Sequence, residues 1–254
     1  RALLHARGRS DKAFHKTVLL IRVPKEKKSD SGTAAEENIG QIREQIAVAE
    51  TIFSAIAGLH PEQGFGAWFY GRNDHASFEI VVKDSKISFY VAVPDKIRDF
   101  IEQQIHAQYP HAEITEETDY NIFKPQSVVV GAYLWLKHQS AFPIKNYQKM
   151  ESDPLVALLN PLSRIAENEG AVIQYIVRPS GASWRKQGVD MIRSIRGGKK
   201  FESVMDKKWY TGLGDSIRSS TSTGDKKKEG EEPYRMSQME EEMVKNMEEK
   251  NFLT

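Results

Sequence analysis

The 254-residue chain contains no cysteine. Without a thiol it has no disulfide framework, no thiolate-bound zinc, no iron–sulfur cluster and no cysteine nucleophile. It also lacks long hydrophobic runs. The longest, residues 128–136 (VVVGAYLWL), is nine residues long, whereas a helix that spans a bilayer needs about 20.

An excess of charge of one sign is missing as well. The 36 Lys and Arg residues nearly balance the 35 Asp and Glu residues and leave a net charge of +1. The overall charge therefore identifies neither a nucleic-acid nor a membrane partner, and only local charge is informative.

The chain begins with arginine, and no hydrophobic core of a signal peptide follows. We therefore expect the numbering to start inside a longer gene product. Residues 1–15 contain four basic residues, Arg1, Arg7, Arg9 and Lys12, with little periodicity. This pattern predicts a basic flexible N-terminal segment. The segment is either a solvated tail or, where an anchor holds it near a membrane, a contact for lipid headgroups.

A first α+β module is predicted over residues 16–120. Strands are expected at residues 17–23, 77–82, 87–93 and 112–115, and helices at 36–59 and 94–110. This order is that of the split βαβ pattern, in which two helices cover one face of a four-stranded antiparallel sheet.

A second α+β module is predicted over residues 121–200. Strands are expected at residues 127–138, 144–148 and 171–178, and helices at 153–165, with Asp153 as N-cap, and at 182–196. One strand of the pattern is missing, and we expect it from beyond Thr254. The predicted fold class is α+β, with two ferredoxin-like modules, the second incomplete at its C-terminus.

The remaining residues are polar. Residues 201–234 are rich in Ser, Thr, Gly, Lys and Glu and are predicted to be a disordered insertion. Residues 235–254 are predicted to contain a charged helix at 236–250, with Met239, Met243 and Met247 on one side, and then the start of another strand at Phe252.

No pattern of catalytic, metal-binding or cofactor-binding residues is found in the sequence. The seven histidines are scattered and match no metal-ligand spacing. The string nearest to a phosphate-binding loop, RGGKK at 196–200, lacks the leading glycine and the Ser or Thr that follows the lysine. Gly64 and Gly66 predict a turn rather than a nucleotide site. We therefore predict no catalytic site, no metal and no cofactor, which disfavours a hydrolytic enzyme.

An RNA-recognition surface is also disfavoured. The strand predicted at 17–23 has no aromatic residue on which a base would stack. Phe89 alternates with Ile87 and Val91, so we expect it in the core.

The strongest local charge lies between residues 178 and 200, where seven basic residues and a single acidic one, Asp190, give a net charge of +6. The candidate binding residues are Arg178, Arg185, Lys186, Arg193, Arg196, Lys199 and Lys200. Of these, Arg185, Arg193, Arg196 and Lys200 fall mostly opposite the apolar stripe of Trp184, Ile192 and Ile195. This face is suited to a phosphate backbone or an acidic partner, or it is an ordinary solvated face.

Three parts of the sequence together resemble a known family. They are LLIRVPKE with the AAEEN…AETIFSAIAGL helix at 19–59, ISFYVAVPDKIRDFIEQQIHAQYPHAEI at 87–114, and FPIKNYQKMESDPLVALLNPLSRI followed by QYIVRPSGASWRKQG at 142–188. They are similar to the region ahead of the motor in membrane-anchored ATPases of type IV secretion and conjugative DNA transfer.

The resemblance implies a non-catalytic N-terminal region of a translocation ATPase that assembles the machine or engages its substrate. It further implies a location on the cytoplasmic side of the membrane, with the anchor outside this chain. The implied partners are the motor domain of the same polypeptide, other subunits of the secretion complex, DNA and further copies of the chain. The Walker strings of the motor are absent from these residues. The alternative is a free-standing nucleic-acid-binding protein that uses the basic helix at 182–200.

Overall fold

A computed structural model describes residues 15–24, 39–118, 120–149, 154–206 and 235–252. The chain divides into two compact units. Unit 1 comprises Arg1–Gly131 and Lys145–Gly181, and unit 2 comprises Ala132–Ile144 and Ala182–Thr254. Each unit has a hydrophobic core of its own.

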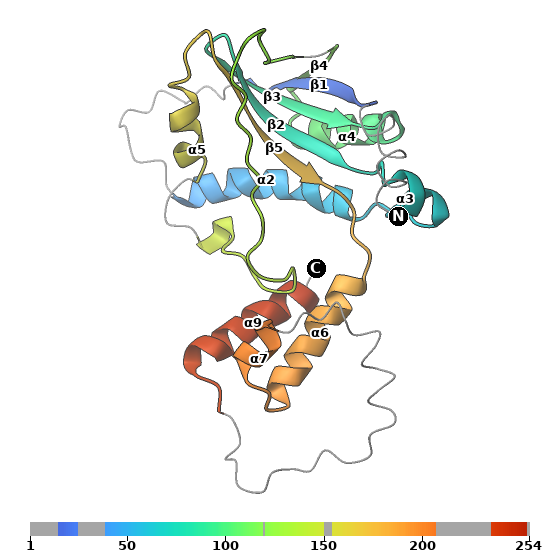
Figure 1. The fold of residues 1–254 in the computed structure, drawn as a ribbon, viewed down its shortest axis with the longest axis vertical. Helices are drawn as coiled ribbons and strands as arrows, with labels where there is room; N and C mark the ends of the chain where they lie inside the picture. Colours follow the sequence, from blue (N-terminus) through green and yellow to red (C-terminus); the bar gives the residue numbers. More distant parts are fainter. Residues whose placement is uncertain (1–14, 25–38, 119, 150–153, 207–234, 253–254) are drawn as a thin grey trace, which may run out of the picture. The chain divides into compact units, whose positions relative to one another are not determined.

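Unit 1 is built on a five-stranded antiparallel sheet with the strand order β4-β1-β3-β2-β5 (Figure 1). Its strands are β1 (Thr17–Arg22), β2 (Ala76–Lys83), β3 (Lys86–Val93), β4 (Glu113–Glu117) and β5 (Gly170–Val177). The first four strands lie where the apolar patterns predict them. Asp84 and Ser85 join β2 to β3 in a two-residue turn and both have positive φ angles, as tight hairpins require.

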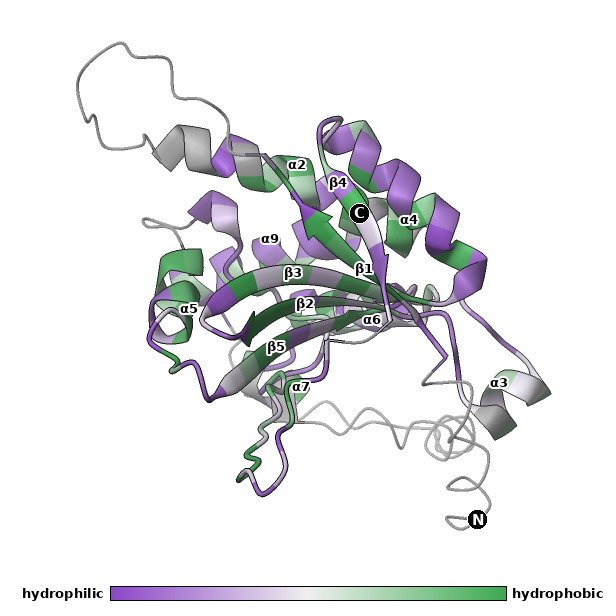
Figure 2. Cartoon of the chain, turned by 90° about the horizontal axis from the view of Figure 1, so that it is seen from above, coloured by the Kyte–Doolittle hydropathy of each residue, from purple (hydrophilic) through white to green (hydrophobic). Residues whose placement is uncertain are grey.

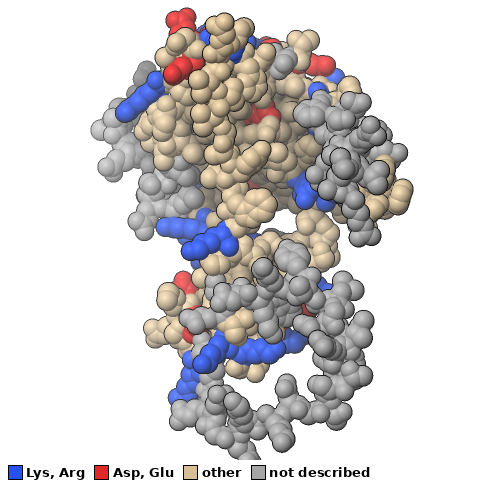
Figure 3. Space-filling model, viewed as in Figure 1, with Lys and Arg blue, Asp and Glu red and all other residues tan. Residues whose placement is uncertain are grey.

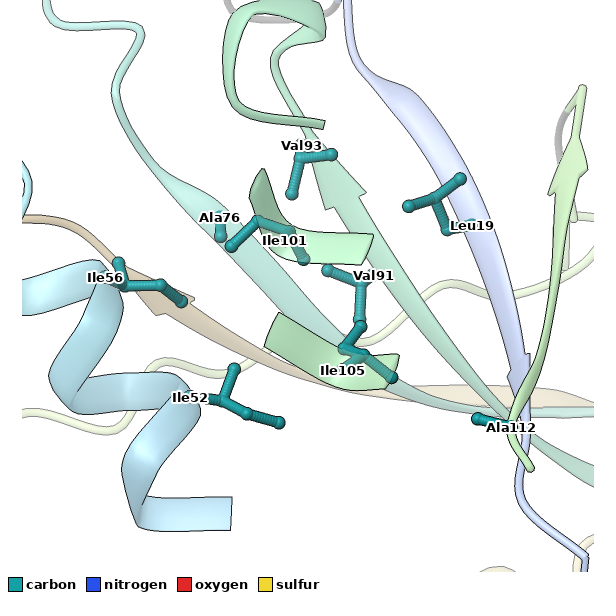
Figure 4. Close-up of a cluster of buried hydrophobic side chains, with 9 residues drawn as sticks. All are labelled: Leu19, Ile52, Ile56, Ala76, Val91, Val93, Ile101, Ile105 and Ala112. Atoms are coloured by element: carbon teal, nitrogen blue, oxygen red, sulfur yellow. The ribbon is translucent and has the colours of Figure 1, made fainter. Parts of the chain in front are cut away.

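Two helices cover one face of this sheet. They are α2 (Ile39–Ala57) and α4 (Asp95–Gln108), both of which the apolar spacing predicts. Figure 4 shows Ile52 and Ile56 of α2 and Ile101 and Ile105 of α4 beside sheet residues of the same core. These nine side chains are buried: Leu19, Ile52, Ile56, Ala76, Val91, Val93, Ile101, Ile105 and Ala112.

Helix α5 (Pro154–Leu162) packs on a further part of the same face. Its Leu162 joins Ile80 and Val82 of β2 in a second buried cluster, and Figure 2 shows how hydrophobic β2 is along its length. The prediction that Phe89 belongs to the core is wrong, because this side chain is 49% exposed. Its alternation with Ile87 and Val91 identifies the face of the strand but not how far the helices cover that face.

A short helix, α3 (Phe65–Tyr70), replaces the predicted turn at Gly64 and Gly66. Gly64 precedes it with a φ of 93°, which an L-residue rarely adopts. Phe65, Trp68 and Phe69 of this helix contact one another. Six residues are too few for helical periodicity to be recognised in the sequence.

The predicted second module has no sheet of its own among the described residues. The strand expected at 171–178 is β5, and it pairs with β2 as the fifth strand of the first sheet. Residues 127–138 form no strand, and the region 144–148 holds only the start of a 3₁₀ helix, η1 (Tyr147–Lys149). An apolar pattern identifies a strand but not the strand beside it, which explains the misplacement of β5.

Among the described residues, unit 2 is helical. It contains α6 (Ser183–Arg196), α7 (Phe201–Asp206) and α9 (Gln238–Phe252). The buried residues of its core are Ala141, Phe142, Met191, Ile192, Ile195, Phe201, Val204, Val244 and Met247.

Two predictions for the C-terminal residues are wrong. Helix α7 lies where the disordered insertion was expected to begin, and Phe252 ends helix α9 rather than starting a strand. Met247 is fully buried, whereas Met239 is 75% exposed. The rest of the predicted insertion (207–234), Asp153 and Leu253 lie outside the described residues.

Candidate functional site

Helix α6 carries four of the seven predicted binding residues. It is amphipathic: Gly188, Met191, Ile192 and Ile195 are buried, while Arg185, Lys186, Arg193 and Arg196 are exposed. The helix ends at Gly197 and Gly198, and exposed Lys199 and Lys200 follow. Figure 3 shows Lys and Arg side chains gathered on the unit that contains α6.

Two of these cations are already paired. The Arg196 guanidinium lies 2.6 Å from the Glu248 carboxylate of α9, and Arg193 lies 3.3 Å from Asp190 one turn away. Within the described part of the chain, Arg185, Lys186, Lys199 and Lys200 have no ion pair with a carboxylate. The Arg185 guanidinium lies 5.6 Å from the centre of the Trp184 ring, within cation–π range. Among the described residues of α6 and the segment that follows it, these four hold the positive charge that no carboxylate neutralises.

Arg178 belongs to unit 1, at the end of β5, and not to the helix. Its charge, after burial and the charge of Lys16, helps to lower the pKa of His75. The structure thus gives Arg178 a polar environment that differs from that of the α6 cations.

That environment is a polar cluster, which the sequence patterns did not identify. The Arg72 guanidinium lies 2.6 Å from Asp74 and also donates to the Pro179 carbonyl at 2.6 Å. The Lys16 ammonium donates to the Asn73 side chain at 2.8 Å. The polar cluster links the loop before β2 to the start of β1 and the end of β5. The sequence contained one sign of this polar cluster, which is the polar segment 71–75 directly before the buried strand β2.

The cluster shifts three pKa values downward. Burial lowers the pKa of Lys16 to about 8, against the attraction of Glu62 and Asp74. Burial, then the charge of Lys16, lowers the pKa of His75. Burial alone raises the pKa of Asp74, but hydrogen bonds and the charge of Arg72 outweigh it and leave that pKa below its ordinary value.

Stability of unit 1 is expected to rise with pH in two windows. An unfolded chain binds more protons than the folded one wherever a folded pKa is depressed. Stability should therefore fall as the pH drops through 6.5 because of His75, and rise from about pH 8 to 10.5 because of Lys16. Urea unfolding across this range measures both effects. His75→Gln should remove the first, and Lys16→Met should remove the second and weaken the first, because the charge of Lys16 helps to lower the pKa of His75. A pH profile that both variants leave unchanged would contradict the assignment.

A buried carboxylate lies on the sheet face opposite α2 and α4. Glu79 of β2 is only 4% exposed. Its Oε1 accepts hydrogen bonds from Ser77 and Gln174, both at 2.7 Å, and its Oε2 accepts one from the Tyr120 hydroxyl. Tyr120 also packs on Tyr90, with ring centres 4.8 Å apart. Since its hydrogen bonds are all made within the fold, Glu79 serves the structure and not a ligand.

Among the described residues, the most exposed apolar segment comprises residues 128–136, which we call the apolar run. Its exposed fractions are 91% for Val128, 64% for Val129, 89% for Val130, 95% for Tyr133, 99% for Leu134, 91% for Trp135 and 51% for Leu136. The described residues between β4 and η1 form no helix or strand (Figure 1). A contiguous apolar surface of this kind is typical of a binding site.

The described residues contain no group of His, Cys, Asp or Glu that would hold a metal ion. None of their helices is long and apolar enough to span a membrane.

The described residues define an α+β protein built on a five-stranded antiparallel sheet. The family described as a domain of unknown function (DUF8128) matches residues 42–237, and the chain belongs to this family. No curated protein and no solved structure matches the chain.

Proposed function

We propose that this chain is a non-catalytic assembly and substrate-engaging region of a translocation ATPase of the type IV secretion and conjugative kind. The observation that carries the proposal is the exposed apolar run at 128–136. Such a surface needs a macromolecular partner, because apolar area left in water is unfavourable. The fold supports the proposal, since its first four strands have the order of a ferredoxin-like module.

In this proposal the motor domain belongs to the same polypeptide. Other secretion subunits, further copies of the chain and DNA are the partners, and the location is the cytoplasmic side of a membrane, with the anchor outside this chain. Three sequence segments, within residues 19–59, 87–114 and 142–188, support it by their resemblance to pre-motor regions.

The complete open reading frame and an ATPase assay test this proposal. We expect the reading frame to continue into a nucleotide-binding loop, and its full product to hydrolyse ATP as an oligomer. The 254-residue chain alone should show no turnover. A reading frame that ends near Thr254, or turnover by this chain alone, would refute the proposal.

A second candidate function is nucleic-acid binding by α6 and the residues that follow it. The observation that favours it is the set of exposed cations without an ion pair in the described part of the chain: Arg185, Lys186, Lys199 and Lys200. A phosphate backbone attracts such groups, and its release of counterions makes binding dependent on salt.

Charge reversal at Lys186 and Lys200 is expected to weaken DNA binding about tenfold or more and to lower the slope of log K against log salt by about 2. Fluorescence anisotropy with a labelled oligonucleotide measures both. The matched control reverses Lys83 and Lys86, two exposed lysines of the β2–β3 hairpin. Equal losses in both double variants, or none in the α6 variant, would exclude this surface.

A further inference from the structure

The apolar run has the composition of an interior β-strand. Seven of its nine residues are Val, Tyr, Trp or Leu on both sides of the Gly131-Ala132 pair, and none is charged. Strands buried on both faces have continuous apolar sequences of this kind. β-Branched and aromatic residues also favour extended backbone.

The backbone of this run is unpaired among the described residues. Backbone hydrogen bonds of the neighbouring turns stop at Ser127, which donates to Lys124, and resume at Phe142, which donates to Gln139. An extended segment with free N–H and C=O groups is a template for another strand. The same unpaired groups argue against insertion into lipid, where nothing would satisfy them.

We propose that the apolar runs of two copies of this chain pair with one another as antiparallel strands, with the two-fold axis at Ala132. This pairing rests on the proposed function in one respect. The proposed function expects copies of the chain to associate, and the pairing says which residues they associate through.

Self-complementarity favours a second copy as the occupant. Pairing about Ala132 sets Val128 opposite Leu136, Val129 opposite Trp135, Val130 opposite Leu134 and Gly131 opposite Tyr133. Each pair combines a β-branched residue or glycine with a larger side chain, and an aromatic ring opposite a glycine covers the exposed backbone. No like charges face one another within the run, and a two-fold arrangement closes the dimer.

The exposed area is sufficient for a small interface. If each of the seven large side chains loses about half of roughly 150 Å², two copies bury about 1,000 Å². That value is at the lower limit for a specific interface, so we expect dimers with micromolar dissociation constants.

Sedimentation and single-cysteine cross-linking of the full 254-residue chain test the pairing. The chain has no cysteine of its own, so each variant reports one position. We expect a concentration-dependent dimer and, under mild oxidation, a disulfide-linked dimer for Ala132→Cys, since residues on the axis approach within bonding range. Ser85→Cys, in the exposed β2–β3 turn, is the control and should cross-link at least tenfold more slowly.

A charge within the run should separate the copies. Leu134→Asp is expected to weaken dimerisation at least tenfold, whereas Met239→Asp, at an exposed position of α9, should leave it unchanged. Leu134 is 99% exposed, so its replacement should not disturb the fold of the monomer, and circular dichroism checks this.

Three results would overturn the pairing: a monomer at 100 µM protein, equal cross-linking at positions 85 and 132, or dimers that Leu134→Asp leaves intact. A monomeric chain whose full-length product still assembles as an ATPase would refute the pairing and leave the proposed function standing. A stable dimer of a chain whose reading frame encodes no motor would support the pairing and refute the proposed function.

Discussion

Replacing Gly188 by alanine is expected to destabilise unit 2 by about 2–3 kcal/mol, the upper part of the range for overpacked cores. In most helix interiors this change is stabilising by up to about 1 kcal/mol, because glycine is a poor helix former. The sign reverses here because helix α9 lies against α6 at this position. A β-carbon on Gly188 would lie 2.0 Å from Oδ1 and 2.4 Å from Cγ of Asn251.

Asn251 has little freedom to move away. It is buried, and its Nδ2 donates to the Met247 carbonyl at 2.7 Å and to the Ala141 carbonyl at 3.3 Å. Either the side chain gives up these bonds or the two helices separate. Both outcomes disturb the core that contains Met191 and Met247.

The double variant Gly188→Ala/Asn251→Ala separates this collision from other effects. Asn251→Ala removes the three atoms nearest to the new methyl group, which are Oδ1, Cγ and Nδ2 of Asn251, so in that background Gly188→Ala should be neutral or stabilising. The coupling in a double-mutant cycle should reach about 2 kcal/mol, as for residues in direct contact. Urea unfolding and hydrogen exchange of α6 and α9 amides measure it.

Gly66→Ala is the matched control for the glycine itself. Gly66 lies in α3, and a β-carbon there would meet no atom within 4 Å. This variant should be as stable as the natural chain or slightly more so. Losses of the same size at positions 66 and 188 would show that the contact with Asn251 is unimportant.

The sheet of unit 1 was largely predictable from its sequence, and the reasons are local. Alternation places Phe78, Ile80 and Val82 on one face of β2, and the polar turn after Lys83 fixes the hairpin. The position of β5 was not predictable, because its pairing with β2 joins residues about 90 apart in the chain. The apolar run predicted a strand, but it pairs with none of the strands of the described residues.

The candidate site was predictable only in part. Helical spacing correctly separates the exposed cations of α6 from its buried stripe. It does not show that Arg196 and Glu248 meet across two helices, or that Arg178 belongs to the polar cluster of unit 1. Such contacts depend on the tertiary packing of distant segments, which residue spacing does not encode.

Removing the carboxylate of Glu79 is expected to give the second large effect. Glu79→Ala should lower the free energy of unfolding of unit 1 by about 3 kcal/mol, because three buried or part-buried donors lose their acceptor. Those donors are the side chains of Ser77, Gln174 and Tyr120. Water has little access to Ser77 and to the position of the carboxylate, which are both buried, so it does not replace the oxygen lost there.

Two further variants divide this effect among its causes. Glu79→Gln keeps one acceptor oxygen but introduces an amide that must donate, so its cost should be roughly half as large. Glu113→Ala removes an exposed carboxylate that is paired with Arg22 at 3.4 Å, and it should cost no more than about 0.5 kcal/mol. Urea unfolding of the three variants at pH 7 gives the comparison. If Glu79→Ala and Glu113→Ala had equal stability, the hydrogen bonds to Glu79 would contribute nothing to the fold, and the carboxylate would have to be buried for a ligand instead.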